Sequence, residues 1–139
     1  MNAYEYTIAV RVKHPSIDPT VVTDALRIEP QHSWKAGVSR RTPTGEPLEG
    51  TYRESYWTGQ VLETERMSSD EMPLEDALNR SAARLQRAEE FLSKLIDDGG
   101  SIELFVGIFG AGTFGIELPA ALLARLGGLG VAVSLDVYP

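Results

Sequence analysis

A long polar stretch from Ile28 to Arg53 limits most strongly what this chain can fold into. Its residues, IEPQHSWKAGVSRRTPTGEPLEGTYR, include too many turn formers for a helix. Compact domains rarely contain a structureless connection longer than about 12–15 residues unless it is functional or disordered. We therefore expect a long loop at about 28–51 and look for a working surface there.

Charge is distributed unevenly along the chain, whose formal net charge is −7. Residues 27–53 are net positive because they hold five cations against three anions: Arg27, Lys35, Arg40, Arg41 and Arg53 against Glu29, Glu46 and Glu49. Proteins that bind duplex nucleic acids usually carry a strongly basic face. The overall balance therefore argues against binding to nucleic acids or to anionic membranes.

Length and composition predict one domain over residues 1–139. The hydrophobic fraction of 42% is sufficient for one core. The chain has no Cys, which excludes disulfides, thiolate nucleophiles and Cys-based metal sites. No apolar segment approaches the roughly 20 residues of a membrane span, and no signal peptide is evident. We expect a cytoplasmic protein that is not associated with a membrane.

The first half of the chain predicts two strands and one helix. Residues 4–12 alternate and place four apolar side chains on one side: Tyr6, Ile8, Val10 and Val12. Asp18 and Pro19 are typical of the N-cap and first position of a helix, which would end near Leu26. Residues 51–62 favour a second strand, although their pattern does not show which face is buried.

The second half begins with a strong helical pattern. One stripe at helical spacing predicts a long helix over 74–96: Leu74, Leu78, Ser81, Leu85, Ala88, Leu92 and Ile96. Ser69 or Asp70 would cap its start. Strands are then expected over 102–108 and 131–137, with a short edge strand over 114–118 and a short helix over 119–126. The alternation predicts an α+β fold: a two-layer sandwich with a mostly antiparallel sheet, helices on one face, and a ferredoxin-like arrangement.

No motif in the chain defines a catalytic or cofactor site. Residues 110–115 match G-x-G-x-x-G, but the following helix can begin only near Pro119, too late for a dinucleotide-binding turn. The simpler interpretation is a glycine-rich bend. His14 and His32 are the only imidazoles and are interpreted as exposed loop residues, so we expect no metal and no cofactor. No nucleophile–base pair can be named, and we expect no catalytic residues.

Cations also follow one flank of the predicted long helix: Arg80, Arg84, Arg87 and Lys94. One interpretation is a stripe that binds a partner. The simpler interpretation is pairing within the helix, because Asp76 precedes Arg80 by four residues and Glu90 precedes Lys94 by four.

The polar stretch supplies the candidate ligand-binding residues. Arginine presents a planar fork suited to carboxylate or phosphate, and Trp and Arg are enriched in binding hot spots. The candidates are Trp34, Lys35, Arg40, Arg41, Arg53 and Trp57, which with Tyr56 could form a basic-aromatic patch. The alternative is that Trp34 and Trp57 fold the stretch onto the sheet as a small core, with the cations in solvent.

Several motifs occur in a characteristic order along the chain. They are D-P-x-x-V-T-x-A-L-x-I-x-P (Asp18 to Pro30), Trp34-Lys35-x-Gly37, Ser55-Tyr56-Trp57 and L-A-R-L-G-x-L-G-V-A-V-S-L-D-V-Y (Leu123 to Tyr138). With the Leu-rich helix, this pattern resembles the bacterial DUF4279 family of uncharacterised domains over nearly the whole chain. The resemblance implies one small α/β domain and no established catalytic residues.

Two functional hypotheses follow. The first is a non-enzymatic interaction domain that binds a basic protein partner through an acidic surface, as toxin-immunity proteins do. The second is a small module in which the Arg and Trp residues of the polar stretch bind an anionic metabolite. Homodimerisation through an exposed sheet edge is compatible with either hypothesis.

Overall fold

A sheet with strand order β2-β5-β1-β7-β8 forms the centre of the molecule. The structure is a computed structural model that describes residues 2–139. The strands of the sheet are β1 (Glu5–His14), β2 (Pro30–Trp34), β5 (Ser55–Gln60), β7 (Ser101–Phe109) and β8 (Val131–Tyr138), with β6 (Met67–Ser68) added beside β1. All pairings are antiparallel except that of β7 with β8. The prediction of an α+β fold with a mostly antiparallel sheet is confirmed.

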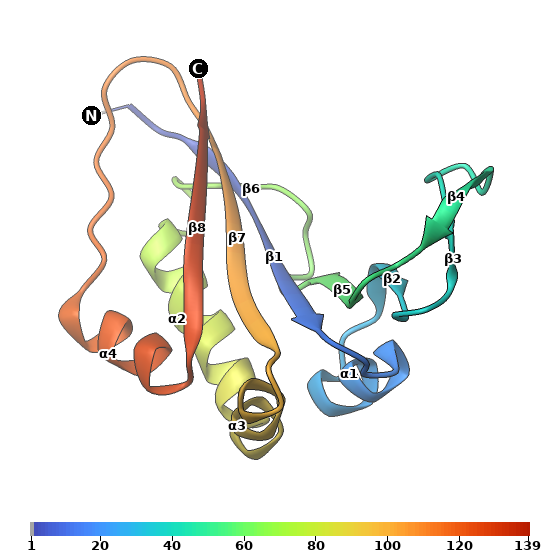
Figure 1. Ribbon diagram of the computed structural model, residues 1–139. Helices are drawn as coiled ribbons and strands as arrows, with labels where there is room; N and C mark the ends of the chain where they lie inside the picture. The colour runs from blue at the N-terminus through green and yellow to red at the C-terminus, as the bar shows by residue number, and fades with distance from the viewer. Residues whose placement is uncertain (1) are drawn as a thin grey trace.

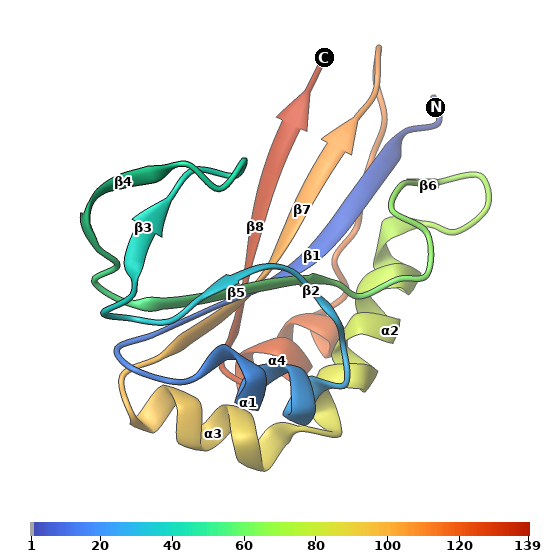
Figure 2. The same cartoon turned by 90° about the vertical axis from the view of Figure 1, so that its right-hand side faces the viewer.

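Within residues 2–139, four helices form the second layer, whose arrangement Figure 1 shows. They are α1 (Pro19–Leu26), α2 (Leu74–Gln86), α3 (Glu89–Asp97) and α4 (Ala120–Gly128). A two-stranded hairpin of β3 (Ser39–Arg41) and β4 (Pro47–Thr51) projects from the sheet, as Figures 1 and 2 show from two sides. The ferredoxin-like arrangement stays a prediction.

The alternating pattern of β1 accounts for the position of the core. Tyr6, Ile8, Val10 and Val12 are at most 3% exposed. In the antiparallel register they lie opposite four equally buried side chains of β7: Ile108, Val106, Leu104 and Ile102. In β5, Trp57 and Gly59 are also buried and pair with Val12 and Val10. A Cβ at Gly59 would lie 2.7 Å from the Trp57 ring, so this close approach requires glycine.

Helix α1 begins as its sequence predicts. Asp18 is the N-cap and its carboxylate accepts a hydrogen bond from the Thr20 amide at 3.0 Å, which lowers the pKa of Asp18. Pro19 occupies the first helical position, where a missing N–H costs nothing. The helix ends at Arg27, which has left-handed backbone angles (φ 56°, ψ 43°).

The prediction of one helix over 74–96 is wrong, because the chain breaks at Arg87–Ala88 into α2 and α3. Figure 1 shows α3 turned away from the axis of α2, and α3 packs against β7. The turn keeps Leu92 and Leu95 in the core, each at most 2% exposed. The start of α2 also differs: neither Ser69 nor Asp70 caps it, and the Leu74 amide donates to the Tyr4 hydroxyl at 3.1 Å.

The predicted loop at about 28–51 contains three strands. β2 extends the sheet by pairing with β5, and β3 pairs with β4 through a turn at residues 42–46. Gly45 has a φ of +89°, which glycine adopts without strain. The expected edge strand over 114–118 is absent from the described residues, where 110–119 connects β7 to α4 without pairing as a strand. The sequence analysis predicted a loop here because polar and turn residues do not show that β2, β3 and β4 each pair with another strand.

We predict that Leu85→Ala destabilises the protein by about 2–5 kcal/mol, because Leu85 is fully buried and its truncation leaves a cavity. The free energy of unfolding would be measured by urea denaturation. Leu123→Ala is the matched control, since Leu123 is 49% exposed and should cost less than about 0.5 kcal/mol. Equal losses in the two variants would contradict this core.

We predict that stability falls as the pH rises from about 10 to about 12. Burial raises the pKa of Tyr6 from 10.0 to about 12, so the unfolded chain releases this proton at lower pH than the folded chain does. Tyr6→Phe loses the hydroxyl bond to the Met72 carbonyl (2.8 Å) and should be less stable at neutral pH. Its free energy of unfolding should nevertheless fall less steeply over this pH range, and an unchanged slope would contradict the assignment.

Candidate functional site

A cleft of about 920 Å³ lies between β2 and the β3–β4 hairpin. We call it the hairpin cleft and define it by six of its lining residues: His32, Trp34, Arg40, Arg41, Tyr52 and Tyr56. β2 supplies His32 and Trp34, β3 supplies both arginines, and Tyr56 comes from β5. The sheet therefore holds one wall of the cleft and the projecting hairpin holds the other.

Stacked aromatic rings join the two walls. The Trp34 ring lies 4.5 Å from the ring of Tyr52 and 4.6 Å from that of Tyr56, with interplanar angles of 13° and 27°. The Tyr52 hydroxyl also contacts the backbone of Arg41, accepting from its amide at 3.2 Å and donating to its carbonyl at 3.3 Å. Such aromatic pairs contribute about 0.5–1.5 kcal/mol beyond their burial. The stack thus fixes the hairpin relative to the sheet.

The two arginines of the cleft contact backbone carbonyls of the hairpin. Arg41 Nη1 donates to the Gly45 carbonyl at 3.1 Å, and Arg40 Nη1 donates more weakly to the Glu49 carbonyl at 3.4 Å. A guanidinium has five N–H donors, so most remain available on each residue. No Asp or Glu is among the residues that line the cleft. Its lining is therefore positively charged in an acidic chain.

The structure brings together three of the six residues predicted from the sequence: Trp34, Arg40 and Arg41. Lys35 and Arg53 are exposed but lie outside the lining of the cleft. Trp57 is 1% exposed, and its Nε1 donates to Thr23 Oγ1 at 3.0 Å within the domain. Trp57 is thus a core residue, as the alternative interpretation held, because alternate residues of a strand point to opposite faces. Tyr56, which the sequence analysis placed in the same basic-aromatic patch, also lines the cleft, whereas Tyr52 and His32 were missed.

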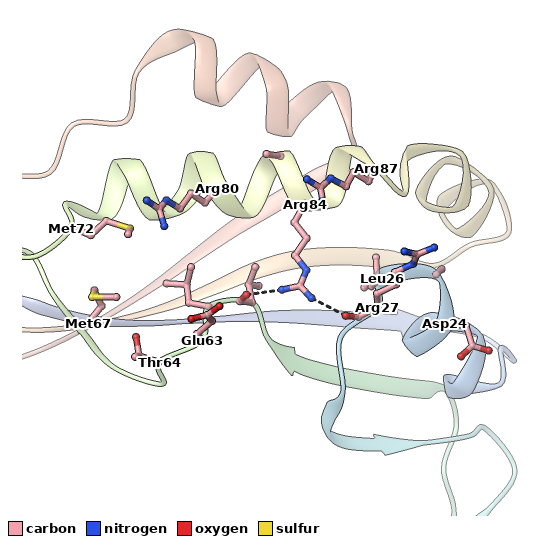
Figure 3. Close-up of a pocket in the computed structure, with 14 residues that line it drawn as sticks. Asp24, Leu26, Arg27, Glu63, Thr64, Met67, Met72, Arg80, Arg84 and Arg87 are labelled. Carbon is pink, nitrogen blue, oxygen red and sulfur yellow. Dashed lines mark hydrogen bonds between the residues drawn. The ribbon is translucent and has the colours of Figure 1, made fainter.

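A second cleft, of about 970 Å³, lies between α1, α2 and the segment that follows β5. We call it the arginine cleft because four arginines line it: Arg27, Arg80, Arg84 and Arg87 (Figure 3). The spacing of Arg80, Arg84 and Arg87 was the sequence signal for this cleft. The predicted pairing within the helix is wrong, since neither Asp76–Arg80 nor Glu90–Lys94 is among the ion pairs within 4.0 Å in residues 2–139.

The two histidines have different environments. His14 is not an exposed loop residue: it ends β1, is 7% exposed, and its Nδ1 accepts bonds from the Ser16 and Ile17 amides at 3.0 and 2.8 Å. These contacts fix the turn after β1 and give His14 a structural role. His32 is exposed at the hairpin cleft, as expected, although it lies in a strand.

Comparison with known proteins identifies a family. A family model described as a domain of unknown function (DUF4279) matches residues 4–139. The chain belongs to the DUF4279 family. No curated protein and no solved structure gives a significant match. Within residues 2–139 of this DUF4279 domain, no helix has the length and apolar character needed to cross a membrane.

We predict that Trp34→Ala loosens the hairpin without unfolding the domain. The Gly37 amide donates to the Tyr52 carbonyl at 2.8 Å, and the Tyr52 amide donates to the Val38 carbonyl at 3.0 Å. Both amides should exchange hydrogen faster in the variant, because the aromatic stack that holds them together is lost. The amides of β1 and β7 should be unaffected.

Tyr138→Ala is the matched control, because Tyr138 stacks on Phe109 far along the sheet from the hairpin. It should leave the exchange of Gly37 and Tyr52 unchanged. Equal exchange in Trp34→Ala and the native protein would show that the stack does not hold the hairpin.

Proposed function

We propose that this DUF4279 domain is a non-catalytic binding module for a small anionic ligand with a flat apolar part, held in the hairpin cleft. The observation that carries the proposal is the lining of the cleft, which combines Arg40 and Arg41 with an aromatic stack and contains no carboxylate. Ligand sites typically combine apolar walls with a few placed polar groups.

The arginines account for the anionic group of the ligand. Their bonds to the Gly45 and Glu49 carbonyls orient the guanidinium groups without neutralising their charge. A carboxylate or phosphate would therefore gain charge-assisted hydrogen bonds from donors that are already positioned.

The aromatic residues account for the flat apolar part. Trp34 is partly exposed, and Tyr52 and Tyr56 are partly exposed beside it. Planar groups pack well against such rings because both surfaces are flat and weakly hydrated. His32 adds a polar group to the same cleft.

The non-catalytic part of the proposal rests on the contacts of the cleft. Among the hydrogen bonds of residues 2–139, none joins His32 to a hydroxyl or carboxylate. A base that activates a nucleophile normally lies within hydrogen-bonding reach of it. Binding of a basic protein partner, an immunity-like role, a homodimer, a cytoplasmic location and bacterial origin stay predictions from the sequence.

Phenyl phosphate is a suitable probe because it unites a flat ring with a dianion. We predict saturable amide chemical-shift changes in residues 31–45 and 52–56 when it is titrated against the native protein. Arg40→Gln with Arg41→Gln should weaken binding about tenfold or more, since each tenfold corresponds to about 1.4 kcal/mol. Inorganic phosphate and phenol should each bind more weakly than phenyl phosphate.

Lys35→Gln with Arg53→Gln is the matched control. It removes two positive charges from the same part of the chain, but both residues lie outside the cleft. Its affinity for phenyl phosphate should stay within about twofold of the native value, because both side chains are exposed and salt screens exposed charges that do not contact the ligand. Equal weakening in the two double variants, or no saturable shift in the native protein, would contradict the proposal.

A further inference from the structure

The arginine cleft is separate from the hairpin cleft and shares no lining residue with it. It lies on the helical side of the sheet, where α2 faces the end of α1 (Figure 3). Arg80, Arg84 and Arg87 are at i, i+4 and i+7, so they follow one side of α2 and its C-terminal end. Arg27 comes from the C-terminal end of α1.

Arg84 fixes the geometry of this cleft. Its Nη1 donates to the Val61 carbonyl at 3.0 Å and its Nη2 donates to the Arg27 carbonyl at 2.7 Å. The left-handed conformation of Arg27 ends α1 at this contact. One guanidinium thus ties α2 to the ends of both α1 and β5. The two carbonyls accept from two of its five N–H donors and leave its positive charge in place.

The charges of the other arginines are also uncompensated. Two carboxylates line the cleft, Asp24 and Glu63, against four guanidinium groups. Neither lies within 4.0 Å of an arginine of the cleft: the ion pairs in residues 2–139 are Arg11–Glu103, His14–Asp98 and Arg66–Glu5. Like charges at i, i+4 repel one another. A bound anion would relieve this repulsion.

The apolar part of the cleft indicates that the ligand is larger than a free ion. Leu62, Met67 and Met72 are partly buried against the core. Figure 3 shows Met67 and Met72 at the end of the cleft nearest Arg80. Methionine side chains are flexible and adapt to apolar groups of varied shape. This arrangement suits a charged group with an attached apolar body.

We infer that the arginine cleft binds a phosphate-bearing small molecule, with Arg80 and Arg87 contacting the phosphate and Arg84 holding the walls of the cleft in place. Guanidinium groups along one wall of a cleft match the dianionic charge and multiple acceptor oxygens of a phosphate, and the flexible Arg80 and Arg87 side chains can turn toward it. Among the side-chain hydrogen bonds of residues 2–139, none involves the guanidinium group of Arg80 or of Arg87. All of their side-chain donors are therefore available.

Inorganic pyrophosphate is the probe for this site. In the native protein, we expect saturable chemical-shift changes at Arg27, residues 61–64 and residues 80–87. Arg80→Gln with Arg87→Gln should weaken binding at least about tenfold. Both side chains are exposed, so this variant should keep its fold and its melting temperature. Glu63→Gln should tighten binding, because it removes a negative charge beside the anion.

Lys35→Gln with Arg53→Gln is again the matched control for net charge and should bind pyrophosphate within about twofold of native. Arg40→Gln with Arg41→Gln should also retain pyrophosphate binding at this cleft, which separates a failure here from a failure of the hairpin cleft. Absence of saturable binding, shifts confined to residues 31–45, or unchanged affinity in Arg80→Gln/Arg87→Gln would overturn the inference.

Discussion

The central strand β1 is the element on which the rest of the structure depends. It pairs with β5, β7 and β6, so it joins segments that are far apart in the sequence. Tyr6 of β1 and Tyr4, just before the strand, also fix the start of α2: the Tyr6 hydroxyl donates to the Met72 carbonyl, and the Tyr4 hydroxyl accepts from the Leu74 amide. β1 and the residue before it thus determine both the sheet and the position of the helix that carries Arg80 and Arg84 and is capped by Arg87.

The two layers give the two clefts different origins. The hairpin cleft exists because β2 is a short edge strand, after which the chain leaves the sheet as a hairpin. The arginine cleft lies between α1 and α2, which both cover the sheet. The two hydrogen bonds of Arg84 connect α2 to the ends of α1 and β5. A change in the packing of one layer need not alter the other cleft. This separation makes two independent binding sites physically reasonable in a small domain.

Local patterns predicted the regular parts of the fold, and long-range contacts decided the rest. The alternation of β1 and the Asp18–Pro19 start of α1 are properties of neighbouring residues, so the sequence predicted both. The break between α2 and α3 follows from packing on β7, and the cap of α2 comes from Tyr4, 70 residues away. For the candidate site, residue type identified Trp34, Arg40 and Arg41. It could not separate them from Arg53 and Trp57, because the direction of each side chain depends on strand pairing.

The net charge of −7 does not prevent either cleft from attracting an anion. Electrostatic interactions between exposed charges decay over about 8–10 Å at physiological salt, so the nearest groups dominate the potential inside a cleft. The hairpin cleft has no carboxylate in its lining, and the arginine cleft has two against four guanidinium groups. The negative net charge has another effect, because it disfavours anions elsewhere on the molecule. An acidic domain with two local basic clefts would therefore concentrate anionic ligands at those clefts and reject polyanions that need a broad basic face.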